Sequence, residues 1–243
     1  MNAMTESPAS RDTARLRPAR VLLCAATRWE ADPLAKRLGL NAETEGLSLG
    51  RAGKTPVELL KTGMGADNAA RALAALPASR NFSCVLSVGL AGSLQAQAQP
   101  GDLVADFSEG NDSLKEAVRA AAQKAGAVLR FGAIADSPAS VLAPAAKKAL
   151  GEKTGAMAVD METAAVRRWA KARGLSAPAL RVILDGMDDE IPMETPAGED
   201  AASLIKFAAA HAGELGRLWS IGRRQRRGMA VLAQVLEEFL PCL

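Results

Sequence analysis

Short apolar runs alternate with amphipathic segments along most of this chain. Six runs predict strands, at 20–26, 46–51, 55–63, 84–89, 102–107 and 177–185. Two further strands are predicted at 127–135 and 156–159. Apolar residues at helical spacing predict helices at 28–38, 66–76, 113–126 and directly after Asp160. Strands alternating with helices predict an α/β fold of three layers, in which helices flank a largely parallel mixed sheet.

The two ends of the chain differ from this pattern. Residues 1–19, rich in Ser, Pro, Arg and Asp, predict a disordered arm before a main domain at 20–200. Residues 201–243 predict a C-terminal helical extension packed on or beside that domain, with breaks near 213–216 and 228. The extension carries the run RRQRR at 223–227, which is either a solvated basic face or a contact with an anionic membrane surface.

Composition excludes several functional classes. The 243 residues carry a net charge of +3, too balanced for a nucleic-acid partner, and no tyrosine that could stack on bases. Three widely spaced cysteines fit no metal or redox motif, and Cys24 and Cys84 lie in apolar runs, as expected of buried thiols in a reducing cytoplasm. The single histidine, His211, argues against both a serine hydrolase and a zinc site.

Glycines and carboxylates gather where predicted strands end. Glycine-rich turns occur in KTGMGADNAA (61–70) and SVGLAGSL (87–94), where the backbone can approach a flat ligand or bind an anion. Three acids, Glu30, Glu162 and Asp185, also follow strands, and the exits of parallel strands share one edge of the sheet. Converging carboxylates without metal ligands favour acid–base chemistry through an oxocarbenium-like transition state.

Five motifs in the same order resemble the purine and uridine nucleoside phosphorylase superfamily. VDMETAAV resembles its V-E-M-E-x-x-A signature, and TGMGADNAA resembles T-G-[IM]-G-x-x-N-A-A. The stretches AATRWEADPL, SVGLAGSLQAQAQPGDLV and RVILDGMDD are similar to three further family motifs. The similarity covers about 20–192 and is greatest to the hydrolytic branch, the methylthioadenosine/S-adenosylhomocysteine nucleosidases.

The resemblance implies roles for individual residues. Glu30 would be the base that activates water, and Asp185 the acid that hydrogen-bonds or protonates purine N7. Met161 would pack against the ribose and Glu162 would accept its hydroxyl hydrogen bonds. Asp160 is expected to point the other way, because adjacent strand residues alternate faces. Further substrate-binding positions follow from the matching turns: Gly63, Gly65, Leu90, Ala91 and Gly92.

Some positions depart from the family pattern. Leu184 replaces a serine that assists the strand-end acid, and no phenylalanine occurs at 134–142 to stack on the base, which leaves Phe107 as the nearest substitute. These departures, together with the tracts DDEIPMETP and SIGRRQRR, resemble the hopanoid-associated phosphorylases, which act on adenosylhopane.

The resemblance therefore implies an N-ribosyl hydrolase that releases adenine from a 5′-substituted nucleoside, with adenosylhopane as the substrate that the subgroup suggests. Two alternatives stay open: a phosphorolytic enzyme of the same fold, for which Arg28 is the only plausible strand-exit cation, and a non-catalytic nucleoside-binding or lipid-binding module. No cofactor or metal is implied. The expected partners are a small-molecule nucleoside and a second copy in a homodimer, in the cytoplasm and with peripheral membrane contact through the C-terminal basic helices.

Overall fold

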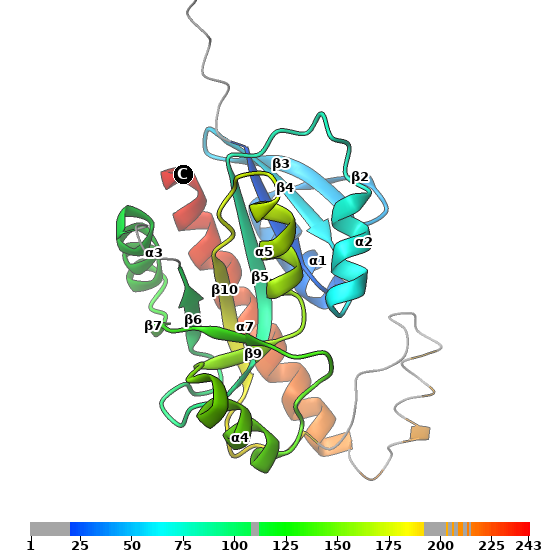
Figure 1. The fold of residues 1–243 in the computed structure, drawn as a ribbon, viewed down its shortest axis with the longest axis vertical. Helices are drawn as coiled ribbons and strands as arrows, with labels where there is room; N and C mark the ends of the chain where they lie inside the picture. Colours follow the sequence, from blue (N-terminus) through cyan, green and yellow to red (C-terminus); the bar gives the residue numbers. More distant parts are fainter. Residues whose placement is uncertain are drawn as a thin grey trace, which may run out of the picture.

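A computed structural model describes residues 20–107, 112–191 and 215–243, together with isolated residues between 203 and 213. The arm predicted at 1–19 lies outside the described residues. The described chain builds a ten-stranded mixed sheet with helices on both faces, as the alternating pattern predicts (Figure 1).

Four parallel strands form the centre of the sheet, in the order β4 (Thr55–Lys61), β1 (Val21–Ala25), β5 (Cys84–Ser93) and β10 (Ala179–Asp185). On one side the antiparallel strands β3 (Leu47–Ala52) and β2 (Asn41–Thr44) continue it. On the other side β6 (Leu103–Asp106) runs antiparallel to β10, and β7 (Leu129–Phe131) parallel to β6. The short strands β8 (Ile134–Asp136) and β9 (Ala158–Asp160) attach through β9 to the end of β5.

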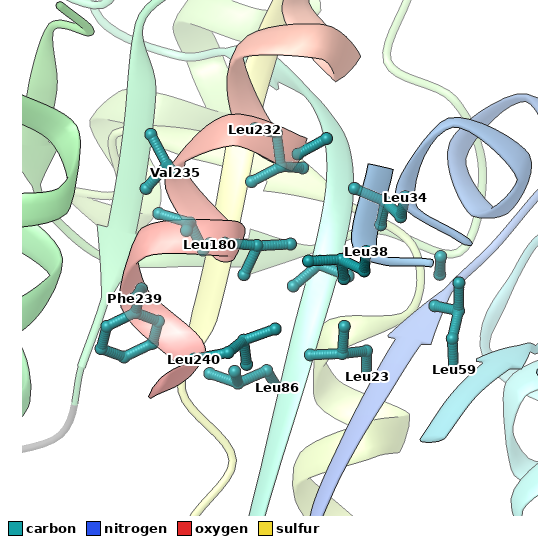
Figure 2. Packing of buried hydrophobic residues seen from close by; sticks show 14 of the residues in the cluster. Leu23, Leu34, Leu38, Leu59, Leu86, Leu180, Leu232, Val235, Phe239 and Leu240 are labelled. Carbon is teal, nitrogen blue, oxygen red and sulfur yellow. The ribbon is translucent and has the colours of Figure 1, made fainter. Parts of the chain in front are cut away.

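Two groups of helices cover the two faces. Leucines of α1 (Arg28–Leu38), residues of α3 (Asp112–Lys124) and the second half of α7 (Leu215–Phe239) pack in one core cluster against β1, β5 and β10. Figure 2 shows Leu232, Val235 and Phe239 of α7 on one side of this cluster and Leu23 of β1 on the other. On the opposite face, α2 (Ala66–Ala74) and α5 (Thr163–Lys171) bury Leu73 and Val166. The main core thus includes α7, which ends in the 3-10 turn η2 (Leu240–Cys242).

The break predicted near residue 228 is wrong, because α7 continues through Gly228. A Cβ at this position would lie 3.0 Å from Cγ1 of Val182, so glycine lets α7 approach strand β10 closely. Glycine weakens a helix interior by ~1 kcal/mol relative to alanine, and burial of the apolar face that follows it outweighs this cost. The break predicted near 213–216 falls where α7 begins, and most of the residues before it lie outside the described ones.

The middle of the chain also differs from expectation. The single strand predicted at 127–135 is two strands, β7 and β8, because pairing with β6 ends at Phe131 and pairing with β9 begins at Ile134. A Cβ at Gly132 would lie 2.9 Å from Cβ of Met157, so the link between the two strands is tightly packed. Strand β5 is longer than predicted and runs through both glycines of its motif. The helix α4 (Pro144–Thr154), which covers β9, and strand β2 were not predicted.

Candidate active site

Glu30 is a buried carboxylate at the start of α1, where it forms a capping box with Thr27. Its Oε2 accepts hydrogen bonds from the backbone N–H groups of Ala26 and Thr27, both at 2.9 Å. Its Oε1 accepts one from the N–H of Leu90 in β5, at 2.7 Å. Thr27 Oγ1 donates a further hydrogen bond of 3.2 Å to Oε2, so these four bonds fix Glu30. Oε1 accepts only one of the four, which leaves its second lone pair for a water molecule.

Glu162 is the N-cap residue directly before α5 and faces the glycine turn before α2. Its Oε1 accepts a hydrogen bond of 2.6 Å from the N–H of Gly65, whose φ of +89° is a left-handed conformation that favours glycine. The thioether of Met161 packs beside Gly65 and accepts a weak hydrogen bond of 3.7 Å from Ser140 Oγ. Gly63, at φ +81°, completes this turn and donates its N–H to the carbonyl of Ala26, so the turn contacts the strand exit that leads to Glu30.

A buried arginine joins these groups. Arg181 of β10 is fully buried, and its Nη2 forms an ion pair of 2.7 Å with Asp160 and lies 4.0 Å from Oε2 of Glu162. Asp160 also accepts the backbone N–H groups of Glu162 and Thr163, so it caps α5 rather than facing the glycine turn. The structure therefore assigns Asp160 to holding Arg181 and the helix start, and leaves Glu162 as the more weakly paired carboxylate.

This environment shifts the titration of Glu162. Burial raises the pKa of its carboxyl from 4.5 to about 7, although Arg181 and the N–H of Gly65 act in the opposite direction. The negative charges of Asp160 and Glu30 raise this pKa further. Glu162 is thus divided between its neutral and ionised forms at neutral pH, and can donate or accept a hydrogen bond.

Asp185 ends β10 and is paired with a residue that the sequence did not single out. The ammonium of Lys147, in α4, forms a short ion pair with Oδ2 of Asp185, and both side chains are buried. Burial raises the pKa of Asp185, and the hydrogen bond and charge of Lys147 oppose that effect. Gly92 of β5 lies beside this carboxylate, since a Cβ there would be 3.3 Å from Oδ2.

Strand β5 contacts the side chains of Glu30, Arg181 and Asp185. Gly89, Leu90, Ala91 and Gly92 pair in register with the last residues of β10, with a bulge before Asp185. Glu30 and Arg181 fill the space beside Gly89, Leu90 binds Glu30, and Gly92 adjoins Asp185. Three residue steps along a strand span ~10 Å, so Glu30 and Asp185 reach the same short piece of backbone. The sequence singled out Gly89 for approach of a ligand, but here it makes room for two side chains of the protein.

Sequence reasoning missed Arg181 and Lys147 as site residues. The sequence held no local signal for Lys147, because a second lysine follows it in an alanine-rich segment without a clear apolar face. Phe107, suggested as a residue that stacks on the base, packs its ring against Phe131 and Phe239 at centroid distances of 6.3 and 6.4 Å. It belongs to the core beneath α7.

The described residues contain no cluster of side chains able to hold a metal ion. Within the same part of the chain, no helix has the length and hydropathy needed to cross a membrane.

Comparison with known proteins identifies the family. The family model of the phosphorylase superfamily matches residues 20–105 and 107–219, and no curated protein sequence matches. Among solved structures, the chain is similar to a 5′-methylthioadenosine/S-adenosylhomocysteine nucleosidase of Helicobacter pylori, with a TM-score of 0.70 at 18% identity over 93% of this chain and 99% of the other. It is also similar to futalosine hydrolase of Helicobacter pylori, with a TM-score of 0.66 at 18% identity over 90% and 98% of the two chains. A Campylobacter jejuni nucleosidase gives a TM-score of 0.63 at 16% identity over 91% and 99%. These likenesses confirm the three-layer α/β fold, and the family match covers most of the sequence: the chain belongs to the phosphorylase superfamily.

Proposed function

We propose that this protein is an N-ribosyl hydrolase that releases a purine from a 5′-substituted nucleoside. The observation that carries the proposal is the convergence of Glu30, Glu162 and Asp185 on residues 89–92 of β5 and the turn at Gly65. The nature of its structural neighbours supports it: they are nucleosidases and a futalosine hydrolase, and one Helicobacter pylori nucleosidase holds 5′-methylthioadenosine in its active site.

Each carboxylate has one role in the proposed reaction. Glu30, fixed by three backbone N–H groups, takes a proton from water as the hydroxide oxygen bonds to C1′ of the ribose. The C1′–N9 bond breaks, its electron pair goes to the purine, and the purine takes up a proton, stabilised by Asp185. Ionised Glu162 accepts hydrogen bonds from the ribose hydroxyls, and Met161 packs against the sugar. Nucleoside and water thus give free sugar and purine.

Water is favoured over phosphate because the cations near the site are already paired with carboxylates. Arg181 is bound to Asp160, and Lys147 to Asp185. The candidate phosphate ligand Arg28 is half exposed, and its Nε lies 3.7 Å from Asp32 on the outer side of α1. Binding a phosphate dianion would need a cation directed at it, so the charges described here suit a neutral nucleophile.

The proposal also covers the identity of the substrate. We infer that the base is adenine and that the 5′-substituent is apolar, as in adenosylhopane, which makes the enzyme part of hopanoid synthesis. The support is the resemblance of the tracts after Asp185 and in α7 to the hopanoid-associated subgroup. The proposal includes a homodimer and a location in the cytoplasm; light scattering of the purified protein tests the dimer.

Membrane contact through α7 follows from the same proposal. The first half of this helix presents Trp219, 62% exposed, with the guanidinium of Arg223 at 4.6 Å from its ring centre. Arg226 and Arg227 lie exposed on the next turn. An aromatic ring bordered by arginines suits the head-group region of an anionic bilayer, where each arginine adds ~1 kcal/mol, weakened by salt.

A product assay tests the reaction. The purified protein is incubated with methylthioadenosine, adenosine and inosine, each with and without phosphate. We expect free adenine and free sugar from the two adenine nucleosides in phosphate-free buffer. Asp185→Asn should lower kcat by ~10²–10⁴, whereas the exposed neighbour Asp188→Asn should not. Glu30→Gln should abolish hydrolysis. A strict requirement for phosphate, with sugar 1-phosphate as product, would identify a phosphorylase instead.

Vesicle sedimentation tests the membrane contact. We expect the protein to bind vesicles of anionic phospholipid at low salt and to dissociate at high salt. A triple variant of Arg223, Arg226 and Arg227 to glutamine should lose this binding. A matched variant with glutamine at Lys148, Lys153 and Lys171 removes the same charge elsewhere, and it should still bind the vesicles. Absence of binding at low salt, or equal loss in both variants, would refute the contact.

A further inference from the structure

Lys147 is a lysine with no exposed surface, which is rare for this residue type. It extends from α4 to the carboxyl end of β10. Its ammonium pairs with Oδ2 of Asp185, and donates to the carbonyl oxygens of Gly186 at 3.0 Å and Asp189 at 2.6 Å. An ammonium has three N–H donors, and three acceptors surround this one. The lysine is therefore fully bonded at a single place, beside the candidate acid.

The acceptors of Lys147 belong to one turn. Gly186 donates its N–H to Oδ2 of Asp189 at 3.0 Å, and Asp189 donates its N–H to the carbonyl of Gly186 at 3.2 Å. Arg224 of α7 binds the same Oδ2 of Asp189 at 2.6 Å. The ammonium of Lys147 thus binds both the carboxylate of Asp185 and the backbone carbonyls of the turn that follows it.

Stability alone gives little reason for such a lysine. Burying an ion pair removes two charges from water, and well-packed apolar residues in its place are often neutral or stabilising. The pair is also not needed to close the turn, which has its own hydrogen bonds between Gly186 and Asp189. A function at Asp185 is a better reason for a cation at this position.

We propose that Lys147 is a positioning residue that keeps Asp185 ionised and engages its Oδ2, so that Oδ1 accepts a hydrogen bond from the leaving purine. The inference rests on the proposed function and refines it, because it makes Asp185 an acceptor rather than the resident proton donor. The proton that the purine takes at N7 then comes from solvent water, and the Asp185 carboxylate binds the N7–H group as the C1′–N9 bond breaks. The hydroxide left in the solvent is neutralised by the proton that Glu30 took from the attacking water and then releases. Lys147 also takes the place of the hydrogen-bonding serine that Leu184 replaces.

The charged groups around Asp185 agree with this role. Burial raises the pKa of Asp185, Lys147 from α4 and Arg224 from α7 lower it, and Asp189 in the turn raises it. Lys147 is the one that touches the carboxylate. Removing its charge should therefore raise the pKa of Asp185 further, so that the carboxylate becomes protonated at a higher pH.

The pH dependence of kcat tests the inference. In Lys147→Met, which keeps the length of the side chain, the acidic limb of the kcat profile should move to higher pH. At acidic pH, kcat of the variant should fall about tenfold for each pH unit by which the limb moves. At alkaline pH the difference in kcat should shrink, and KM should be nearly unchanged at every pH. Lys148→Met, at the exposed neighbouring lysine of the same helix, should match the wild type. A loss of equal size at every pH, or none, overturns the inference.

A measurement on the wild-type protein covers the case in which Lys147→Met does not fold. Carbon-13 NMR of labelled aspartate carboxyls, with Asp185→Asn to assign the resonance, reports the ionisation of Asp185 directly. An ionised carboxylate at pH 7 supports the inference, and a protonated one overturns it. The proposed function fails separately, if the wild type releases purine from none of the nucleosides.

Discussion

Replacing Glu162 with glutamine should stabilise the folded protein at neutral and alkaline pH and leave its stability unchanged below about pH 4.5. Glutamine has nearly the same shape and keeps an oxygen for the N–H of Gly65, but it cannot ionise. The carboxyl of Glu162 has a folded pKa of about 7, raised by burial from 4.5. Its ionised form is therefore less favourable in the folded protein than in the unfolded chain.

The size of the effect follows from linkage. Between pH 4.5 and about 7 the folded protein binds more protons than the unfolded chain, so the free energy of unfolding falls as the pH rises. Each unit of difference in pKa corresponds to 1.36 kcal/mol, which gives a loss of about 3 kcal/mol above pH 7 that Glu162→Gln should recover. For a chain of this size the same amount corresponds to a rise in Tm of about 6–12 °C.

Urea denaturation of both proteins at several pH values between 4 and 8 measures this difference. We expect it to grow from near zero at the acidic end to a plateau above pH 7. The exposed carboxylate Glu152 provides a control, since Glu152→Gln should change the free energy of unfolding by less than ~0.5 kcal/mol at every pH. A difference that does not depend on pH, or a variant less stable than the wild type at pH 8, would refute the reasoning.

Three further outcomes are expected. Glu162→Ala should lose most of the preference for ribosides over 2′-deoxyribosides, a preference worth ~1.5–3 kcal/mol in kcat/KM; an unchanged preference would mean that Glu162 serves only the start of the helix. Gly89→Ala should destabilise the protein by ~1–3 kcal/mol in urea denaturation, because a Cβ there would lie 2.7 Å from Nη1 of Arg181 and would displace the carboxylate beside it; near-normal stability would contradict the close packing. Gly222→Ala should raise stability by ~0.5–1 kcal/mol, since no other atom lies within 4 Å of the added Cβ, whereas Gly228→Ala should gain less against β10; equal gains would show that α7 does not press on the sheet there.

The sequence by itself determined most of the element order. The helix predicted at 28–38 is α1, and the predicted hairpin around 52–54 is β3 and β4. These elements follow from local spacing: apolar residues must recur at the helical period, or fill a buried strand, wherever one side faces a core. The superfamily was also evident in the sequence, because its motifs are short and continuous.

Tertiary structure alone decided where several residues lie. A lysine followed by a second lysine in an alanine-rich helix gives no local sign that Lys147 is buried, and only the packing of α4 over the end of β10 places it beside Asp185. The same holds for Arg181, whose partners come from β5, β9 and α5. Gly228 predicts a break by its propensity, yet α7 continues because the apolar residues after it are buried against the sheet, which approaches the helix closely at Gly228. Burial, charge pairing and close approach depend on segments far apart in sequence, so a local pattern cannot specify them.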